Sequence, residues 1–288
     1  MSEDVFSLPV HEDLSEHISL RRLGGLPVVV VDHPRSRAAV ALQGAHLFAW
    51  QPAGREPVLW LSAASAFKEG TAIRGGVPVC WPWFGPAGQP SHGFARISAF
   101  ELVAADEDED GVRLEFVLRS DERTKQIWPH DFVLFIRMRL GATCEVSLEA
   151  QGDYESTGAL HSYFHVGDVG DVTVSGIGVP YDDQVKNTTG HQEGPLAFPG
   201  RIDRVYTAPE PVSLIEDPAL HRTIEVRHHD FSDMVTWNPG PELSKSMADL
   251  TDDGYQGFVC VETARISRPM TSTPDRPATL SVSLAVAS

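Results

Sequence analysis

Three segments in the middle of the chain alternate apolar and polar residues with a period of two. They span 112–119, 132–140 and 144–151. Successive side chains of a strand point to opposite faces of a sheet, so this alternation places one face in a core and the other in water. The pattern predicts three half-buried strands, and it predicts that the segment 121–130 is a connection between two of them.

Shorter runs of β-branched or small apolar residues, bounded by Gly, Pro, Asp or Asn, predict further strands. These runs lie at 27–31, 37–42, 45–50, 57–61, 98–104, 160–165, 172–175, 212–214, 223–228, 235–238, 257–265 and 279–287. The acidic run 106–111 is typical of a solvated hairpin tip, and 243–250 is the one segment with helical character. Residues 1–20 predict a short helix or an extended N-terminal arm.

No internal repeat or low-complexity linker divides the chain. Many short strands separated by turns, with few short helical turns, favour an all-β fold. We therefore expect a single domain over residues 1–288, built as a β-sandwich or a large mixed β assembly.

The charge of the chain limits its partners. It carries 40 acidic and 23 basic residues, a formal net charge of -17 at pH 7, and its pI is about 5.0. A surface of this sign repels nucleic acid and anionic membranes, so we expect neither as a partner. An anionic substrate would need a locally basic pocket.

The cysteines and the N-terminal residues indicate in which cellular compartment the protein acts. Cys80, Cys144 and Cys260 are far apart and show no Cys-x-x-Cys spacing, which favours buried free thiols in a reducing environment over disulfides or a zinc site. No apolar run approaches the roughly 20 residues of a membrane helix, and residues 1–20 lack the features of a signal peptide. We expect a cytoplasmic protein that acts as a monomer, although the sequence does not decide its oligomeric state.

The segment 73–96 contains three groups suited to an anionic ligand rich in hydroxyl groups, namely Arg74, His92 and Arg96. Glycines and prolines around them favour a stiff loop that can turn tightly. Indole rings such as those of Trp81 and Trp83 stack well on the apolar face of a sugar. The segment predicts a ligand-binding loop; the alternative is a surface loop with a tryptophan packed beneath it.

A second candidate lies in the run 159–165. If this run is a strand, His161, Tyr163 and His165 share one face. The pKa of an unperturbed imidazole lies near neutral pH, so His161 could donate or accept a proton. It could also be a histidine satisfied at a sheet edge. His161 and His165 could form part of a metal site, but the sequence offers no third His or Cys at a suitable spacing.

Two carboxylates complete the candidates. Glu262 follows the apolar run 258–261, so it is either exposed at a strand end or held in a pocket by partners. Asp203 lies in the run 202–206 and could accept hydrogen bonds from sugar hydroxyls, or form a surface ion pair with Arg204. The chain contains no phosphate-binding glycine loop, dinucleotide fingerprint or Gly-x-Ser-x-Gly motif.

Together and in order, six short motifs resemble the D-hexose-6-phosphate mutarotases, also called glucose-6-phosphate 1-epimerases, of the aldose 1-epimerase superfamily. The motifs are Ile73-Arg74-Gly75-Gly76-Val77-Pro78, Trp81-Pro82-Trp83-Phe84-Gly85, His92-Gly93-Phe94-Ala95-Arg96, Leu160-His161-Ser162-Tyr163-Phe164, Asp203-Arg204-Val205-Tyr206 and Val261-Glu262. The resemblance covers nearly the whole chain. It implies a β-supersandwich of the galactose mutarotase type and a reaction that requires no metal and no cofactor.

The resemblance also implies a role for each matched residue. His161 corresponds to the general acid that protonates the ring oxygen, and Glu262 to the general base that removes the proton of the anomeric hydroxyl. Rotation in the open-chain aldehyde and reclosure then give the other anomer. A carboxylate and an imidazole with ordinary pKa values provide the opposite protonation states that this reaction needs.

The remaining matches concern substrate binding. The resemblance implies that His92 and Asp203 bind sugar oxygens and that Arg74 and Arg96 bind a 6-phosphate, for which arginine is well suited. Ser91 and Ala264-Arg265 depart from the family pattern, which leaves the preferred sugar open. Two alternatives stay open: a mutarotase for unphosphorylated aldoses, and a carbohydrate-binding protein without turnover. The need for catalysis is also open, because sugars anomerise spontaneously.

Overall fold

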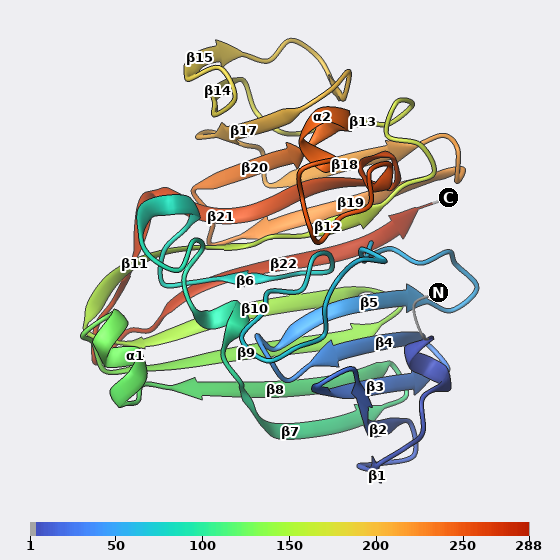
Figure 1. The fold of residues 1–288 in the computed structure, drawn as a ribbon, viewed down its shortest axis with the longest axis vertical. Coiled ribbons are helices and arrows are strands. Elements are labelled where there is room, and N and C mark those ends of the chain that lie inside the picture. The colour runs from blue at the N-terminus through green and yellow to red at the C-terminus, as the bar shows by residue number, and fades with distance from the viewer. Residues whose placement is uncertain (1–3, 288) are drawn as a thin grey trace.

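A computed structural model describes residues 4–287 (Figure 1). All strand pairings recorded among these residues are antiparallel and belong to three sheets. The first sheet has the order β1-β2-β3-β4-β5. Its strands are β1 (Glu12–Asp13), β2 (Ile18–Leu23), β3 (Leu26–His33), β4 (Ser36–Ala41) and β5 (His46–Pro52).

The second sheet has nine strands in the order β16-β13-β18-β19-β22-β10-β9-β8-β7. They are β7 (Glu101–Asp108), β8 (Gly111–Arg119), β9 (Phe132–Gly141), β10 (Cys144–Gly152), β13 (Thr173–Ser175), β16 (Leu196–Ala197), β18 (Val212–Asp217), β19 (Arg222–His229) and β22 (Ala278–Ala287). Residues buried on one face alternate with partly exposed ones along β9 and β10, as the sequence pattern predicts.

The third sheet has the order β15-β14-β17-β20-β21-β11-β6, and β12 also pairs with β21. Its strands are β6 (Val79–Cys80), β11 (Tyr154–Leu160), β12 (Tyr163–His165), β14 (Pro180–Asp183), β15 (Thr188–His191), β17 (Ile202–Tyr206), β20 (Asp233–Asn238) and β21 (Phe258–Ser272). The helices are short: α1 (Glu122–Ile127), α2 (Gly240–Ser244) and the 3-10 turns η1 (Val5–Ser7), η2 (Gly85–Ala87), η3 (Ala95–Ile97) and η4 (Gly254–Gly257).

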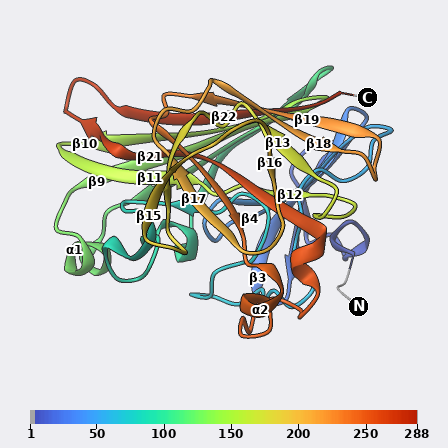
Figure 2. The same ribbon diagram turned by 90° about the horizontal axis from the view of Figure 1, so that it is seen from above.

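The nine-stranded sheet forms one layer, and the two smaller sheets pack on its apolar face. Figure 2 shows β10, β22 and β19 along one side of the molecule and β3 and β4 on the other. One large apolar core contains side chains from all three sheets, such as Val40, Leu148 and Val261. The all-β prediction is therefore confirmed, and the architecture is a β-sandwich.

Strand β21 shows how the third sheet separates core from site. Val259 and Val261 belong to the large core, whereas Cys260 belongs to a separate aromatic cluster on the opposite face. Glu262 follows the same alternation as Cys260 and lies on that opposite face. The face that points away from the core thus carries the residues with potential chemistry.

Several strand predictions are confirmed to within a few residues, but others are wrong. The segment 57–61 is not a strand; it contributes only isolated bridges. The run 160–165 is broken between β11 and β12, and the strand predicted at 98–104 begins at Glu101. The acidic run 106–111 lies partly on β7 and β8, and only residues 109–110 form the turn.

The helical predictions need correction as well. The segment 121–130 contains α1, whose first turn is closed by a capping box between Asp121 and Thr124. The helix expected at 243–250 begins earlier in the chain, because α2 spans Gly240–Ser244. Of the range 1–20, residues 1–3 lie outside the described part, residues 5–7 form η1, and β2 begins at Ile18 as part of a sheet. No helix within 4–287 has the length and apolarity needed to cross a membrane.

Candidate active site

The loop that contains Arg74 is joined to the His161 segment through the backbone. The Tyr163 N–H donates to the Gly76 carbonyl over 2.8 Å, and the His161 N–H donates to the Pro78 carbonyl over 3.0 Å. Gly76 has a φ of 64°, and a Cβ there would lie 2.3 Å from the Leu47 carbonyl oxygen. Only glycine fits this close approach, which brings two distant motifs side by side.

His161 occupies the break between β11 and β12. Its side chain is only 9% exposed, and the imidazole stacks on the ring of Tyr163, with the ring centroids 4.8 Å apart and the planes 8° apart. His165 does not belong to the group of possible ligand atoms around His161 within residues 4–287, which contains Cys260 and Glu262 instead. The structure therefore brings His161 and Tyr163 together, and the idea of a His161–His165 metal pair finds no support.

Glu262 lies directly across from His161. It is the fifth residue of β21 and is 1% exposed, so the interpretation as an exposed strand end is wrong. Its Oε1 lies 3.4 Å from His161 Nε2. Within the described residues, Glu262 Oε2 and His161 Nδ1 have no hydrogen-bond partner. Buried polar atoms normally have partners, so this arrangement leaves capacity for the polar atoms of a ligand.

The electrostatics of this pair differ from the ordinary pKa values expected from the sequence. Burial raises the pKa of Glu262 well above its usual value, and the charge of Asp203 adds to this effect. Burial lowers the pKa of His161 well below its usual value, assisted by His92, Arg74 and Arg96. Both shifts favour the neutral groups, so they widen the pH range over which the pair holds a single proton.

His92 lies beside His161, with their ring centroids 5.7 Å apart. Its φ is 64° and that of Gly93 is 73°, a sharp turn that carries the ring to the site. His92 Nδ1 accepts the Gly85 N–H over 3.3 Å. Burial lowers the pKa of His92 to about 4, with further contributions from Arg96 and Arg74. His92 is thus a neutral donor through Nε2 at physiological pH.

The two arginines differ in their partners. Arg74 donates from Nε to Oδ2 of Asp249 over 3.0 Å and from Nη1 to the Tyr163 hydroxyl over 2.9 Å. Its Nη2 lies 2.9 Å from the same Asp249 oxygen and completes the ion pair. Arg96 donates to the Ser91 carbonyl over 2.8 Å, and no carboxylate of residues 4–287 lies within ion-pair distance of it. Arg96 therefore carries an uncompensated charge, whereas that of Arg74 is neutralised.

Asp203 lies on β17 opposite Trp237 of β20. Its side chain is half-buried, and burial raises its pKa, partly opposed by the charge of Arg201. The predicted alternative of an Asp203–Arg204 surface pair is wrong, because Arg204 approaches Asp183 instead, at 3.7 Å. Asp203 is close enough to influence Glu262, as the pKa of Glu262 shows.

An aromatic cluster borders the pair. Tyr163 and Phe258 pack with Trp60 and Trp237. The rings of Trp237 and His161 lie 6.3 Å apart between centroids. The tryptophans expected to stack on a ligand, Trp81 and Trp83, instead pack with the large core. Trp237 lies in the irregular segment 237–249, which the sequence marks as a possible rim of a site. Trp60 was not identified as a site residue from the sequence, since it belongs to none of the six motifs.

The three predicted free cysteines are confirmed as buried thiols. One of them, Cys260, lies with His161 and Glu262 so that their possible ligand atoms are all within 4.8 Å of one another. The sequence spacing did not indicate this group of three. This set suits a metal poorly. Burial raises the pKa of both Cys260 and Glu262, whereas a metal needs them ionised.

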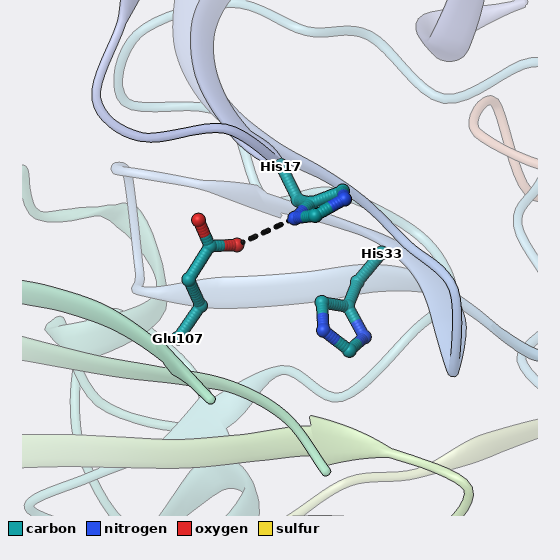
Figure 3. Close-up of side chains that lie close together, drawn as sticks. All are labelled: His17, His33 and Glu107. Carbon is teal, nitrogen blue, oxygen red and sulfur yellow. Dashed lines mark hydrogen bonds and ion pairs between the residues drawn. The ribbon is translucent and has the colours of Figure 1, made fainter. Parts of the chain in front are cut away.

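A second cluster lies far from this site, where β7 meets the N-terminal sheet (Figure 3). His17 Nδ1 lies 3.0 Å from Glu107 Oε2. His33 is engaged through both nitrogens, because Nδ1 accepts the Arg35 N–H and Nε2 donates to the Asp108 carbonyl. With no lone pair left on His33, the cluster joins two sheets rather than forming a metal site.

The family of the chain follows from comparison with known proteins. The family model for aldose 1-epimerase matches residues 27–284. The chain belongs to the aldose 1-epimerase family. It is 51% identical over 295 aligned residues to a Salmonella typhimurium protein named "Putative glucose-6-phosphate 1-epimerase", covering 100% of this chain and 99% of the relative. An Escherichia coli K12 protein of the same name is 52% identical over 292 residues, with the same coverage.

Solved structures agree with this assignment. A Salmonella typhimurium crystal structure described as a "putative mutarotase" superposes on the epimerase with a TM-score of 0.97 at 52% identity, covering 98% of both chains. A galactose mutarotase-like protein from Clostridium acetobutylicum, at 13% identity, shares the fold with a TM-score of 0.70 and covers 97% of this chain. The predicted galactose mutarotase type of sandwich is confirmed. Family membership makes the chain an epimerase and removes the alternative of a binding protein without turnover.

Proposed function

We propose that this epimerase interconverts the α and β anomers of an aldohexose 6-phosphate, with glucose 6-phosphate as its substrate. The observation that carries the proposal is the buried pair of His161 and Glu262, whose facing atoms are 3.4 Å apart. The names of the two relatives at about half identity support the phosphorylated substrate.

In the proposed reaction, Glu262 removes the proton from the anomeric hydroxyl while His161 delivers a proton to the ring oxygen. The bond between the anomeric carbon and the ring oxygen breaks, and the anomeric carbon becomes an aldehyde. After rotation about the adjacent carbon–carbon bond, the ring oxygen attacks the opposite face of the aldehyde. His161 then recovers its proton and Glu262 returns the other, so no net proton is consumed.

The single proton held by the pair suits this sequence. Ring opening requires one group that gives a proton and one that takes a proton at the same time. A pair with two protons has no base, and a pair with none has no acid. Because burial favours the neutral imidazole and the neutral carboxylic acid, the proton must move to the imidazole before Glu262 can act as the base.

The surrounding groups supply substrate binding in this proposal. His92 donates a hydrogen bond from Nε2 to an oxygen near the ring, and Asp203 accepts from a sugar hydroxyl. Arg96, whose charge has no carboxylate partner, binds the 6-phosphate, and Arg74 assists it. The uncompensated charge of Arg96 answers the difficulty that a net charge of -17 creates for an anionic substrate.

One observation favours the alternative of an unphosphorylated aldose. Asp249 neutralises Arg74, which weakens the attraction for a phosphate at that position. Under this alternative, Arg74 would bind neutral sugar oxygens, and the epimerase would act on glucose and on glucose 6-phosphate with similar efficiency. The two substrates therefore need to be compared directly.

The test is exchange NMR between the two anomers of glucose 6-phosphate, repeated on glucose, with the wild type, with Glu262→Gln and without protein. We expect the wild type to accelerate exchange of the phosphorylated sugar well above the spontaneous rate, and Glu262→Gln to abolish the acceleration. Equal efficiency on glucose would refute the phosphate specificity. No acceleration of either sugar would overturn the roles of His161 and Glu262.

A further inference from the structure

Asp249 lies at the start of a chain of contacts that ends at the proposed acid. Its Oδ2 accepts from Nε of Arg74 and forms an ion pair with Nη2, and Nη1 of Arg74 donates to the Tyr163 hydroxyl. The Tyr163 ring lies parallel to the imidazole of His161, at a centroid distance of 4.8 Å. Each contact is direct, so a displacement of Asp249 reaches His161 through two intermediate side chains.

The backbone around Asp249 is fixed, which allows its carboxylate to act as a support. The Asp249 carbonyl accepts from the Ser62 hydroxyl over 2.7 Å, and Ser62 is 3% exposed. The next residue, Leu250, is buried in the aromatic cluster with Tyr163 and Phe258. The backbone is thus held directly after the Asp249 Cα atom, while the side chain that pairs with Arg74 remains 34% exposed to solvent.

The ion pair also changes what Arg74 can bind. Two of the five guanidinium N–H groups donate to Asp249 and Tyr163, and the carboxylate balances the positive charge. A phosphate that approaches Arg74 meets the negative charge of Asp249 at short range, which reduces the net attraction. Arg96 has no such counter-charge among the described residues.

We propose that Asp249 is a positioning and specificity residue of the epimerase: through Arg74 it holds Tyr163 against His161, and it disfavours anions at that arginine. The anion half of this inference rests on the proposed function, whereas the positioning half requires only the epimerase reaction. Asp249 itself contacts neither the anomeric hydroxyl nor the ring oxygen of the sugar in the proposed reaction.

The experiment compares Asp249→Asn, which keeps an acceptor oxygen but removes the charge, with Asp249→Ala, which removes both. Asp252→Asn is the matched control: it removes one negative charge from the same segment, and Asp252 is exposed and makes no ion pair within residues 4–287. For each variant, kcat and KM are measured on glucose 6-phosphate and glucose, together with the Ki of inorganic phosphate. The midpoint of thermal unfolding is recorded as a check on folding.

For Asp249→Asn we expect the KM for glucose 6-phosphate and the Ki of inorganic phosphate to fall about two- to fivefold, the range for a partly exposed charge pair. The KM for glucose should not fall in parallel. For Asp249→Ala we expect kcat to fall at least about tenfold on either sugar that the wild type converts, because Tyr163 no longer holds the His161 imidazole in its position. Asp252→Asn should change none of these values.

Three results would overturn the proposal. A kcat of Asp249→Ala equal to that of the wild type removes the positioning role, and an unchanged or raised Ki of phosphate in Asp249→Asn removes the anion role. The same effects in Asp252→Asn would assign them to general charge. If the wild type proves active on glucose alone, the proposed substrate fails, but the kcat on glucose and the Ki of phosphate still decide both halves of the inference.

Discussion

His161 Nε2 lies 3.4 Å from Glu262 Oε1, and the second polar atom of each side chain has no partner among the described residues. Burial of unpartnered atoms is unfavourable, so the fold retains this pair at a cost to stability. Such a cost is expected where the groups serve chemistry. The two residues come from segments separated by about a hundred positions, and the third sheet brings them together.

The first prediction concerns the two members of the pair. We expect His161→Gln and Glu262→Gln each to lower kcat by about 10²- to 10⁴-fold, the contribution of a positioned acid or base. The double variant should be little worse than either single one, because the two groups act as a unit. Anomer exchange measured by NMR, after subtraction of the spontaneous rate, tests this. Losses that multiply in the double variant would show that the groups act independently.

The second prediction concerns pH. Activity requires the pair to hold one proton, so it falls when His161 gains a second proton and when Glu262 loses the last one. The lowered pKa of His161 and the raised pKa of Glu262 move these limits apart. We expect kcat/KM to be flat through neutral pH and to fall only well outside it. Ordinary pKa values of the two groups would instead give a narrow maximum of kcat/KM between pH 4.5 and pH 6.5.

This pH prediction requires a control, because spontaneous anomerisation itself depends on pH. The rate without protein must be measured in the same buffers and subtracted at each point. A variant such as Asp252→Asn, distant in role from the pair, should reproduce the wild-type profile. A narrow maximum in mildly acidic buffer would contradict the single-proton account of the pair.

The fold could be predicted from the sequence where the pattern is local. The alternation in β9 and β10 defines both strands, because one face of each is in the core. Helix α1 was missed since its capping box uses Thr124 rather than the more usual Glu or Gln. Strands β14 and β15 were missed because each has only four residues and neither sequence alternates apolar and polar residues.

The site could be predicted only in part. The residues of the conspicuous motifs, His161, Arg74 and His92 among them, do gather on one face of the third sheet. Asp249 falls in the segment 237–249 that could rim a site, but its pairing with Arg74 could not be predicted, since the two residues are 175 positions apart. The break at His161 was also invisible, because it arises from a hydrogen bond to Pro78, a contact that depends on the tertiary fold.

The third prediction separates the two arginines. We expect Arg96→Ala to raise the KM for glucose 6-phosphate about 10- to 100-fold, as expected for loss of a hydrogen bond to a charged group. Arg74→Ala should have a smaller effect on this KM and a larger effect on kcat, because its charge is already balanced and it supports Tyr163. The KM for glucose is the control, and neither variant should raise it to the same extent as the KM for the phosphorylated sugar.

The fourth prediction concerns acid stability. His46 is buried behind the Arg74 loop, and its Nε2 donates to the Gly75 carbonyl over 2.7 Å. Burial lowers its pKa from 6.5 to about 4, so the unfolded chain binds a proton first as the pH falls. The stability conferred by neutral His46 is therefore complete above pH 6.5 and is lost as the pH falls to about 4.

The expected loss from His46 between these two pH values is about 3 kcal/mol of unfolding free energy. His46→Gln keeps an N–H donor but does not titrate, so its stability should depend less steeply on pH by this amount. Urea unfolding at neutral and at acidic pH provides the measurement, and His11→Gln, at an exposed position, is the control. Parallel pH dependences for the wild type and His46→Gln would refute the role of His46.

The last prediction concerns the turn that presents His92. Gly93 has a φ of 73°, and a Cβ there would lie 2.0 Å from the Trp81 carbonyl oxygen. Gly54 has a similar φ of 69°, but a Cβ there would meet nothing within 4 Å. We expect Gly54→Ala to cost only about 1 kcal/mol, the strain of a left-handed alanine. Gly93→Ala should cost clearly more, about 3 kcal/mol or above, because the backbone must also move.

That movement has a catalytic consequence, since His92 directly precedes Gly93 and Arg96 follows it three positions later. Gly93→Ala should raise the KM for glucose 6-phosphate even at temperatures where the variant remains folded, whereas Gly54→Ala should leave KM unchanged. Urea unfolding and anomer-exchange NMR on the same preparations test the two effects together. Equal stability and equal KM for the two variants would show that the contact with Trp81 does not hold the turn, and that His92 is placed by other interactions.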